Sequence, residues 1–368
     1  MKHGDTRTRK SPLGRQALGL LALGLGAAFA QPALAQEGRS RAVGYLTQTI
    51  PAGQTRSFSV PFDADTSTQA SSVGKLTAVG ANYLEHSGAS WTPGAFSNVN
   101  APYFVRITSG AHTGRTFRIS ATANTATRIY VTDDGLGLAA LNLATGADGT
   151  RFEIIPADTL GSFFGTGGEL VVQGATSAAG ADLVQVWGGA AWLNFYYNST
   201  WQRWARDTDL ASDPSRNSYV LRSDRGLMIT RRGSTDLDLL VVGRVLNTPQ
   251  RAFHTRTDSA LTFLATMQAS DATLGALALQ SATRSLNWKV AATAADAGQA
   301  DLLIVWSNTS WLSFFYNSSA GHWQRVGDAE TANRDGYTIA AGTPVFVQRR
   351  GTGTSAADKT VIFPTPGS

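Results

Sequence analysis

Two related segments of the chain carry bulky aromatic residues at a spacing that could bind sugar rings. Trp192 and Tyr196 lie four residues apart in an alternating segment, so in a β-strand their side chains point to one face. Trp311 and Phe315 repeat this spacing 119 residues later. Aromatic rings on a sheet face can stack on the apolar faces of sugars. The candidate ligand-binding platform is therefore Trp192, Tyr196, Trp311 and Phe315.

The same aromatic face could instead pack against a neighbouring sheet, because large aromatic residues fill cores and interfaces more often than they bind ligands. The opposite phase of the strand, Leu193, Phe195 and Tyr197, is repeated unchanged in the second segment and is expected to be buried. The phase that holds Trp192 varies between the segments. We expect that variable phase to be partly exposed.

Residues that perform catalysis are few and scattered. After residue 35 the chain has four histidines and five glutamates, and none shows the spacing of a metal site such as H-E-x-x-H. Cysteine is absent from the sequence, which excludes thiol catalysis and Cys-ligated metals. We expect a non-enzymatic protein with no cofactor and no metal site. The aspartates that could ligate Ca²⁺ in loops, although turn formation is their commoner role, are Asp63, Asp65, Asp133, Asp134, Asp207, Asp209 and Asp213.

The aromatic segments belong to a longer internal repeat. Residues 182–187 and 192–199 reappear as residues 301–306 and 311–318, and an Arg-Arg-Gly triplet follows in both copies. We match Trp201-Gln202-Arg203 with Trp323-Gln324-Arg325, which places His322 in a three-residue insertion of the second copy. Each Trp then lies two residues before an Arg and can stack on it. A repeat of this length indicates one structural unit built twice.

The rest of the chain is typical of an all-β protein. Charged residues make up 15% of the sequence, and 38 glycines separate short alternating segments. Residues 103–108 predict a half-buried strand, and residues 115–120 predict its hairpin partner with Phe117 and Ile119 inward. Only residues 136–144 and 271–280 suggest short helices.

The first 35 residues have the pattern of a secretory signal peptide. A basic segment precedes an apolar stretch at residues 17–30, and Ala33-Leu34-Ala35 matches a cleavage site. Five of the 31 basic residues and one of the 26 acidic residues lie there, so removal lowers the net charge from +5 to about +1. This balance argues against nucleic acid as a partner. No later segment is long and apolar enough for a transmembrane helix.

We divide the chain at Pro156 and near Pro249, since proline cannot donate to a strand ladder. The predicted fold is a β-sandwich or barrel-like N-terminal domain followed by two related aromatic-rich β units in tandem. The predicted parts are a signal peptide (1–35), an N-terminal β domain (36–157), a first repeat unit (158–248) and a second repeat unit (249–368).

Phrases spread over most of the mature chain resemble an uncharacterised family of exported, β-rich bacterial proteins found mainly in Verrucomicrobia and their relatives. The resemblance rests on residues 102–110, residues 114–119 and residues 123–127, with further likeness at residues 43–53, 155–160, 300–306 and at Trp323. It implies export and β-rich structure, and it implies no activity.

These observations predict an exported protein, in the periplasm, at the cell surface or outside the cell. Its expected role is structural or adhesive at the cell envelope, with self-association or an envelope component as partner. The alternative is a carbohydrate-binding protein that uses the aromatic platform on a polysaccharide. A glycan-active enzyme would need two facing carboxylates, and the sequence pairs none.

Overall fold

The computed structural model describes residues 43–63, 73–132, 138–253, 259–350 and 360–365. The fold is all-β, as predicted, with helices of at most six residues. Residues 41–368 form one compact unit. The predicted signal peptide lies outside the described residues. Among the described residues, no helix has the length and apolar character needed to cross a membrane.

The first part of the fold is a domain of two small sheets around one core. Its four-stranded sheet has the order β4-β10-β7-β8 and its three-stranded sheet the order β5-β6-β9. Trp91, Leu84 and Ile154 lie in the core between them. The strands are β4 (Val73–Lys75), β5 (Ala78–Val79), β6 (Tyr83–Glu85), β7 (Tyr103–Ile107), β8 (Thr116–Arg118), β9 (Arg128–Tyr130) and β10 (Arg151–Pro156). In the described part of the first predicted helical segment, residues 138–144, a 3-10 helix forms at Leu138–Leu141, and a second 3-10 helix follows the segment at Gly146–Asp148.

The predicted hairpin β7–β8 is confirmed, and Phe117 and Ile119 are buried in it. The prediction that residues 103–108 are half-buried was wrong, because both faces of β7 are buried. On the second face Arg106 lies beside Glu153 of β10, which also binds Arg244 of a strand outside this domain. A buried ion-pair network therefore replaces solvent on that face.

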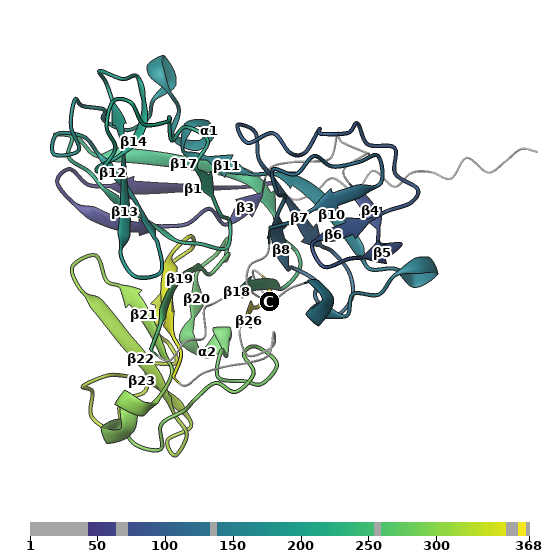
Figure 1. Cartoon of the computed structure of the whole chain (residues 1–368). Helices are drawn as coiled ribbons and strands as arrows, with labels where there is room; N and C mark the ends of the chain where they lie inside the picture. The colour runs from purple at the N-terminus through teal and green to yellow at the C-terminus, as the bar shows by residue number, and fades with distance from the viewer. Residues whose placement is uncertain (1–42, 64–72, 133–137, 254–258, 351–359, 366–368) are drawn as a thin grey trace, which may run out of the picture. The chain divides into compact units, whose positions relative to one another are not determined.

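The second part of the fold, called module 1 here, has a five-stranded antiparallel sheet in the order β14-β13-β12-β16-β2. A ribbon of β1 and β17 runs in register over eight residue pairs, and the two strands lie side by side in Figure 1. The strands are β1 (Val43–Ile50), β2 (Thr55–Phe58), β3 (Phe62–Asp63), β11 (Asp158–Thr159), β12 (Leu183–Trp187), β13 (Trp192–Asn198), β14 (Arg203–Arg206), β15 (Val220–Leu221), β16 (Leu227–Thr230) and β17 (Leu237–Val245).

The third part, module 2, has a five-stranded sheet in the order β23-β22-β21-β25-β19 and two strand pairs, β18-β26 and β20-β24. This order parallels that of module 1 strand for strand. The strands are β18 (Gln250–Phe253), β19 (Leu261–Ala265), β20 (Ala272–Thr273), β21 (Leu302–Trp306), β22 (Trp311–Asn317), β23 (His322–Arg325), β24 (Thr338–Ile339), β25 (Pro344–Gln348) and β26 (Thr360–Phe363).

Strand pairing differs from the predicted boundary at residues 157 and 158. β1 and β2 pair with β17 and β16, so residues 43–58 complete module 1 before the chain enters the two-sheet domain. The two-sheet domain is thus inserted into module 1, and we call it the inserted domain. Module 2 has only residues 266–271 at the corresponding place, between β19 and β20. Short-range patterns carry no trace of a pairing that spans so many residues.

The register also corrects the predicted match of Trp201 with Trp323. Trp204 pairs with Tyr197 and Trp323 pairs with Tyr316, so Trp204 is the counterpart of Trp323. His322 then corresponds to Arg203, and the second copy has no three-residue insertion at this point. The predicted stacking of Arg203 on Trp201 is confirmed, with 5.1 Å between the guanidinium carbon and the ring centroid.

A buried ion pair fixes the same point in both modules. Asp182 binds Arg231 and also accepts the backbone N–H of Arg232, 2.7 Å away. Asp301 binds Arg349 over 2.6 Å, and both side chains are fully buried. The two arginines of each Arg-Arg-Gly triplet therefore anchor the end of a strand to the start of β12 or β21, and the first of them is the partner of a buried carboxylate.

In each module one short α-helix follows the first strand of the central sheet and precedes the other four strands. α1 (Leu160–Phe164) starts at Thr159, whose hydroxyl accepts the N–H of Ser162. α2 (Leu274–Leu277) starts at Thr273, whose hydroxyl accepts the N–H of Ala276. Threonine caps satisfy backbone donors that a helix leaves open at its start. These two helices carry Leu160 and Leu274 into the module cores.

Candidate functional site

The tips of two equivalent hairpins bring four tryptophans together. Trp187 pairs with Trp192 at the end of β12–β13, and Trp306 pairs with Trp311 at the end of β21–β22. The ring centroids are 5.3 Å apart in the first pair and 5.0 Å apart in the second. Cross-strand aromatic pairs of this kind stabilise a hairpin.

Phe346 of β25 lies at the centre of the cluster formed by these tips. Its ring centroid is 5.2 Å from that of Trp187, 5.8 Å from that of Trp192 and 5.0 Å from that of Trp311. Phe263 of β19 packs against Phe346 at 4.5 Å and against both Trp192 and Trp311. Most of these contacts are edge-to-face, the arrangement that aromatic quadrupoles favour. We call this group the aromatic cluster.

The cluster joins the two modules through reciprocal hydrogen bonds. Trp187 of module 1 donates its Nε1–H to the carbonyl of Leu261 in module 2, at 3.0 Å. Trp306 of module 2 donates its Nε1–H to the carbonyl of Thr55 in module 1, at 3.3 Å. In the register of the first sheet, Thr55 lies two strands across from the first residue of β12. In the second sheet, Leu261 lies two strands across from the first residue of β21, so the two residues are equivalent. The contact therefore has the self-complementary pattern of a two-fold interface.

The four predicted platform residues do not form one exposed face. Trp192 and Trp311 lie in the aromatic cluster, and 37% of the Trp311 surface is exposed. Tyr196 and Phe315 are 5% and 1% exposed, so the prediction of their exposure was wrong. Tyr196 packs on Ala181 and Ala205, and Phe315 packs on alanines of residues 291–300. Loops cover the half of each strand that holds Tyr196 or Phe315, and the other module covers the half that holds Trp192 or Trp311.

A groove of about 500 Å³ runs beside the aromatic cluster. Residues 46–49 of β1 form one wall and residues 337–341, which include β24, form the other. Trp306, Tyr337 and Arg56 line it, together with Asn308 at the turn of the second hairpin. Burial raises the pKa of the Tyr337 phenol, so this hydroxyl stays protonated at neutral pH. The groove offers aromatic rings and polar groups, which are the groups that sugars contact. Its charged lining residues are one arginine, Arg56, and one aspartate, Asp271.

Several carboxylates of the modules are held by arginine. A hydrogen bond from Arg216 lowers the pKa of Asp209, and one from Arg334 lowers that of Asp328, in each case against the effect of burial. Burial would raise the pKa of Asp224, but Arg222 and Arg225 lower it. A general acid at neutral pH needs a raised pKa. These three carboxylates are therefore suited to structure and unsuited to proton donation.

Three of the aspartates proposed for Ca²⁺, Asp207, Asp209 and Asp213, serve local structure. Asp207 accepts the side-chain amide of Asn194 at 2.7 Å, and Asp213 accepts the N–H of Leu210 at 2.8 Å. Asp65, Asp133 and Asp134 lie outside the described residues. In the part of the chain that the structure describes, no three or more His, Cys, Asp and Glu side chains are grouped to hold a metal ion.

Sequence reasoning missed Phe263 and Phe346. By register their counterparts in module 1 are Ser57 and Met228, so the phenylalanine pair exists only in module 2. Agreement between the two copies singles out shared residues, and these positions differ. The signal that marks them in the sequence is an aromatic residue in one copy at a position where the other copy has a small or flexible residue.

Comparison with known proteins gives no assignment. A scan against protein-family models finds no match, and a search of curated proteins finds none. We therefore infer function from the geometry of this chain.

Proposed function

We propose that this is an exported, non-enzymatic β-protein with a structural or adhesive role at the cell envelope. The observation that carries the proposal is the use of the duplicated aromatic hairpins. Their tips join two equivalent modules through reciprocal hydrogen bonds and a shared Phe346. Such construction favours a rigid body that presents surfaces over one that encloses a reaction site.

The charge arrangement supports the same proposal. Asp182, Asp301, Asp209 and Asp328 are each bonded to arginine. A glycosidase needs two carboxyl groups that face each other across a bound sugar, about 5 to 10 Å apart. These four carboxylates are instead committed to ion pairs. The resemblance to exported bacterial proteins agrees with this proposal. That resemblance stays a prediction.

Co-sedimentation tests the adhesive role. Residues 36–368 would be incubated with isolated envelope vesicles and cell-wall sacculi, spun down, and measured in pellet and supernatant. We expect saturable binding and no release of reducing ends from the polymers. A protein that stays in the supernatant at every polymer concentration, or that releases reducing ends, overturns the proposal. Sedimentation velocity of the protein alone would show whether self-association accompanies binding.

Carbohydrate binding is the second candidate, favoured by the partial exposure of Trp311 and by the groove that Trp306 and Tyr337 line. Retention on columns of insoluble polysaccharides would test it. Trp311→Ala should reduce retention, whereas Trp201→Ala should not. Trp201 is a matched control because it is a half-buried tryptophan that packs in a different cluster. Equal retention of both variants and the parent protein would exclude the platform.

A further inference from the structure

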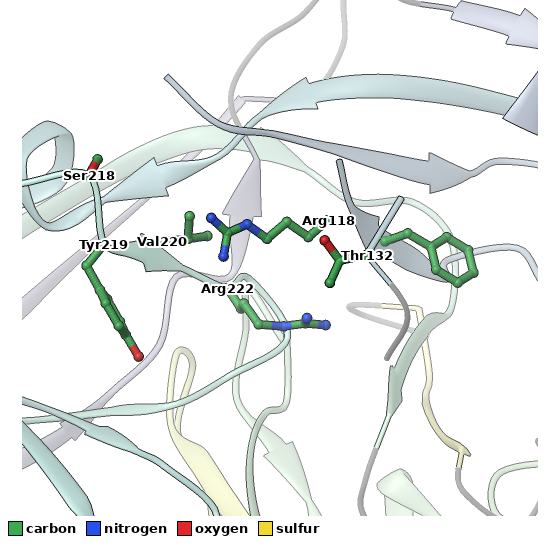
Figure 2. A pocket seen from close by; sticks show the side chains of 7 residues that line it. Arg118, Thr132, Ser218, Tyr219, Val220 and Arg222 are labelled. Carbon is green, nitrogen blue, oxygen red and sulfur yellow. The ribbon is translucent and has the colours of Figure 1, made fainter. Parts of the chain in front are cut away.

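A second cavity lies where the inserted domain meets module 1. It has a volume of about 320 Å³, within the range of small-molecule sites. Arg118 of β8 and Thr132 line it from the inserted domain, and Ser218, Tyr219, Val220 and Arg222 line it from module 1. Figure 2 shows both arginine side chains directed into the space between these two walls.

Positive charge dominates this cavity. Arg222 is fixed by two hydrogen bonds to Asp224, at 2.8 and 3.0 Å. That single carboxylate also interacts with Arg225 and Arg115, so arginines outnumber it. Arg118 and Arg206 both act electrostatically on Tyr219. The cavity therefore attracts an anion, and its guanidinium groups suit a carboxylate in particular.

The polar and aromatic groups of the cavity suit a sugar ring. Ser218 and Thr132 supply hydroxyls, and Tyr219 supplies one wall. The ring of Tyr219 is fixed from behind by Phe195, 4.3 Å away between centroids. Burial, partly opposed by Arg206 and Arg118, raises the pKa of its phenol, which keeps it a hydrogen-bond donor at neutral pH.

The cationic character is specific to module 1. Val220 and Thr338 are equivalent, because they pair with Thr159 and Thr273 at the helix caps. The counterpart of Arg222 is then Ala340, and that of Tyr219 is Tyr337. Tyr337 lines the groove described above, where the one lining arginine, Arg56, is matched by one aspartate, Asp271. Arg118 comes from the inserted domain, for which module 2 has no equivalent. Insertion of that domain has thus turned one of two related sites into a basic pocket.

We infer that this pocket binds the carboxylate of an acidic sugar, with Arg118 and Arg222 on the carboxylate and the hydroxyl-bearing residues on the ring. The inference gives the proposed adhesive role a class of ligand. It rests on that role only for where the sugar comes from. Binding of a free monosaccharide in solution can be measured without any envelope material.

Titration calorimetry with the mature protein tests the inference. The probes are glucuronate, glucose and acetate at equal ionic strength. We expect glucuronate to bind, glucose to bind at least about tenfold more weakly, and acetate to bind more weakly than glucuronate, because only glucuronate engages both arginines and hydroxyls. Absence of glucuronate binding, or equal binding of all three, overturns the inference.

Variants locate the binding. Arg118→Gln should weaken glucuronate binding about tenfold or more, as expected for loss of a charge-assisted hydrogen bond. Arg118 is exposed, so its replacement spares the core. Arg232→Gln removes a charge from another exposed arginine and should leave binding unchanged. Equal loss in both variants would show attraction by net charge alone and overturn the inference. Failure of co-sedimentation with intact glucuronate binding would reject the adhesive role and keep the pocket.

Discussion

Trp187 and Trp306 make the same hydrogen bond in opposite directions between the two modules. Each indole N–H crosses to the carbonyl of an equivalent residue, Leu261 or Thr55, in the first strand of the other module's sheet. A duplicated sequence can form a two-fold contact with itself inside one chain, as two subunits do in a dimer. The repeated tryptophans are thereby explained as the residues of an internal interface.

Phe346 should be the most sensitive position of this interface. Phe346→Ala is expected to lower the free energy of unfolding by about 3–5 kcal/mol, because it leaves a cavity among Trp187, Trp192 and Trp311. Urea unfolding followed by tryptophan fluorescence would measure this. Phe117→Ala in the core of the inserted domain is the control, since it should destabilise the protein without changing the environment of the clustered tryptophans.

The buried pair Asp301–Arg349 should tolerate no single replacement. Arg349→Met leaves Asp301 charged and fully buried, and we expect a loss of about 3–5 kcal/mol in the free energy of unfolding. Arg325→Met removes an arginine that is 43% exposed and should change stability far less. Similar losses in the two variants, measured by urea unfolding, would contradict the assigned role of the pair.

Stability should fall in acid because of Asp209 and Asp328. Their pKa values lie below the ordinary 3.8 in the folded protein, chiefly through hydrogen bonds from Arg216 and Arg334. The unfolded chain therefore binds protons first, and the stabilisation is present above pH 3.8 and lost as pH falls through the folded pKa values. Urea midpoints measured from about pH 6 to about pH 3 should decline, and Asp328→Asn should decline less steeply. A midpoint that is flat over this window would count against these pairs.

The docking of the inserted domain on β18 should depend on Gly114. Its φ is +88°, and a Cβ there would lie 2.2 Å from the carbonyl oxygen of Pro249. Gly53 has a similar φ of +71° and nothing within 4 Å of that position. Gly53→Ala should cost about 1–2 kcal/mol of stability from backbone strain alone. Gly114→Ala should cost clearly more, and equal losses would mean that the contact with Pro249 does not form.

The all-β class and most strands of the inserted domain could be predicted because alternation and turn residues are local signals. The insertion itself could not, since β1 and β2 find their partners in β17 and β16 far along the chain. The alternating pattern of residues 103–108 also failed, because Arg106 on the polar face is buried by Glu153. A charged residue in a strand indicates a solvent-exposed face only when no residue of opposite charge lies beside it on a neighbouring strand.

The platform residues show the same limit. The spacing of Trp192 and Tyr196 correctly placed them on one strand face, and nothing local could tell what covers that face. The other module covers Trp192, whereas a loop covers Tyr196. The basic pocket escaped prediction for a related reason, since Arg118 and Arg222 come from separate parts of the fold and neither belongs to a motif.

Hydrogen exchange of the tryptophan indole N–H groups tests the internal interface most directly. The resonances of Trp187 and Trp306 would be assigned by Trp187→Phe and Trp306→Phe, and their exchange in D₂O followed by NMR. We predict that both exchange slowly and at matched rates, because one interface protects them, while the indole of half-buried Trp201 exchanges fast. Exchange of either Trp187 or Trp306 as fast as that of Trp201 would contradict the proposal that the repeated hairpins join the two modules.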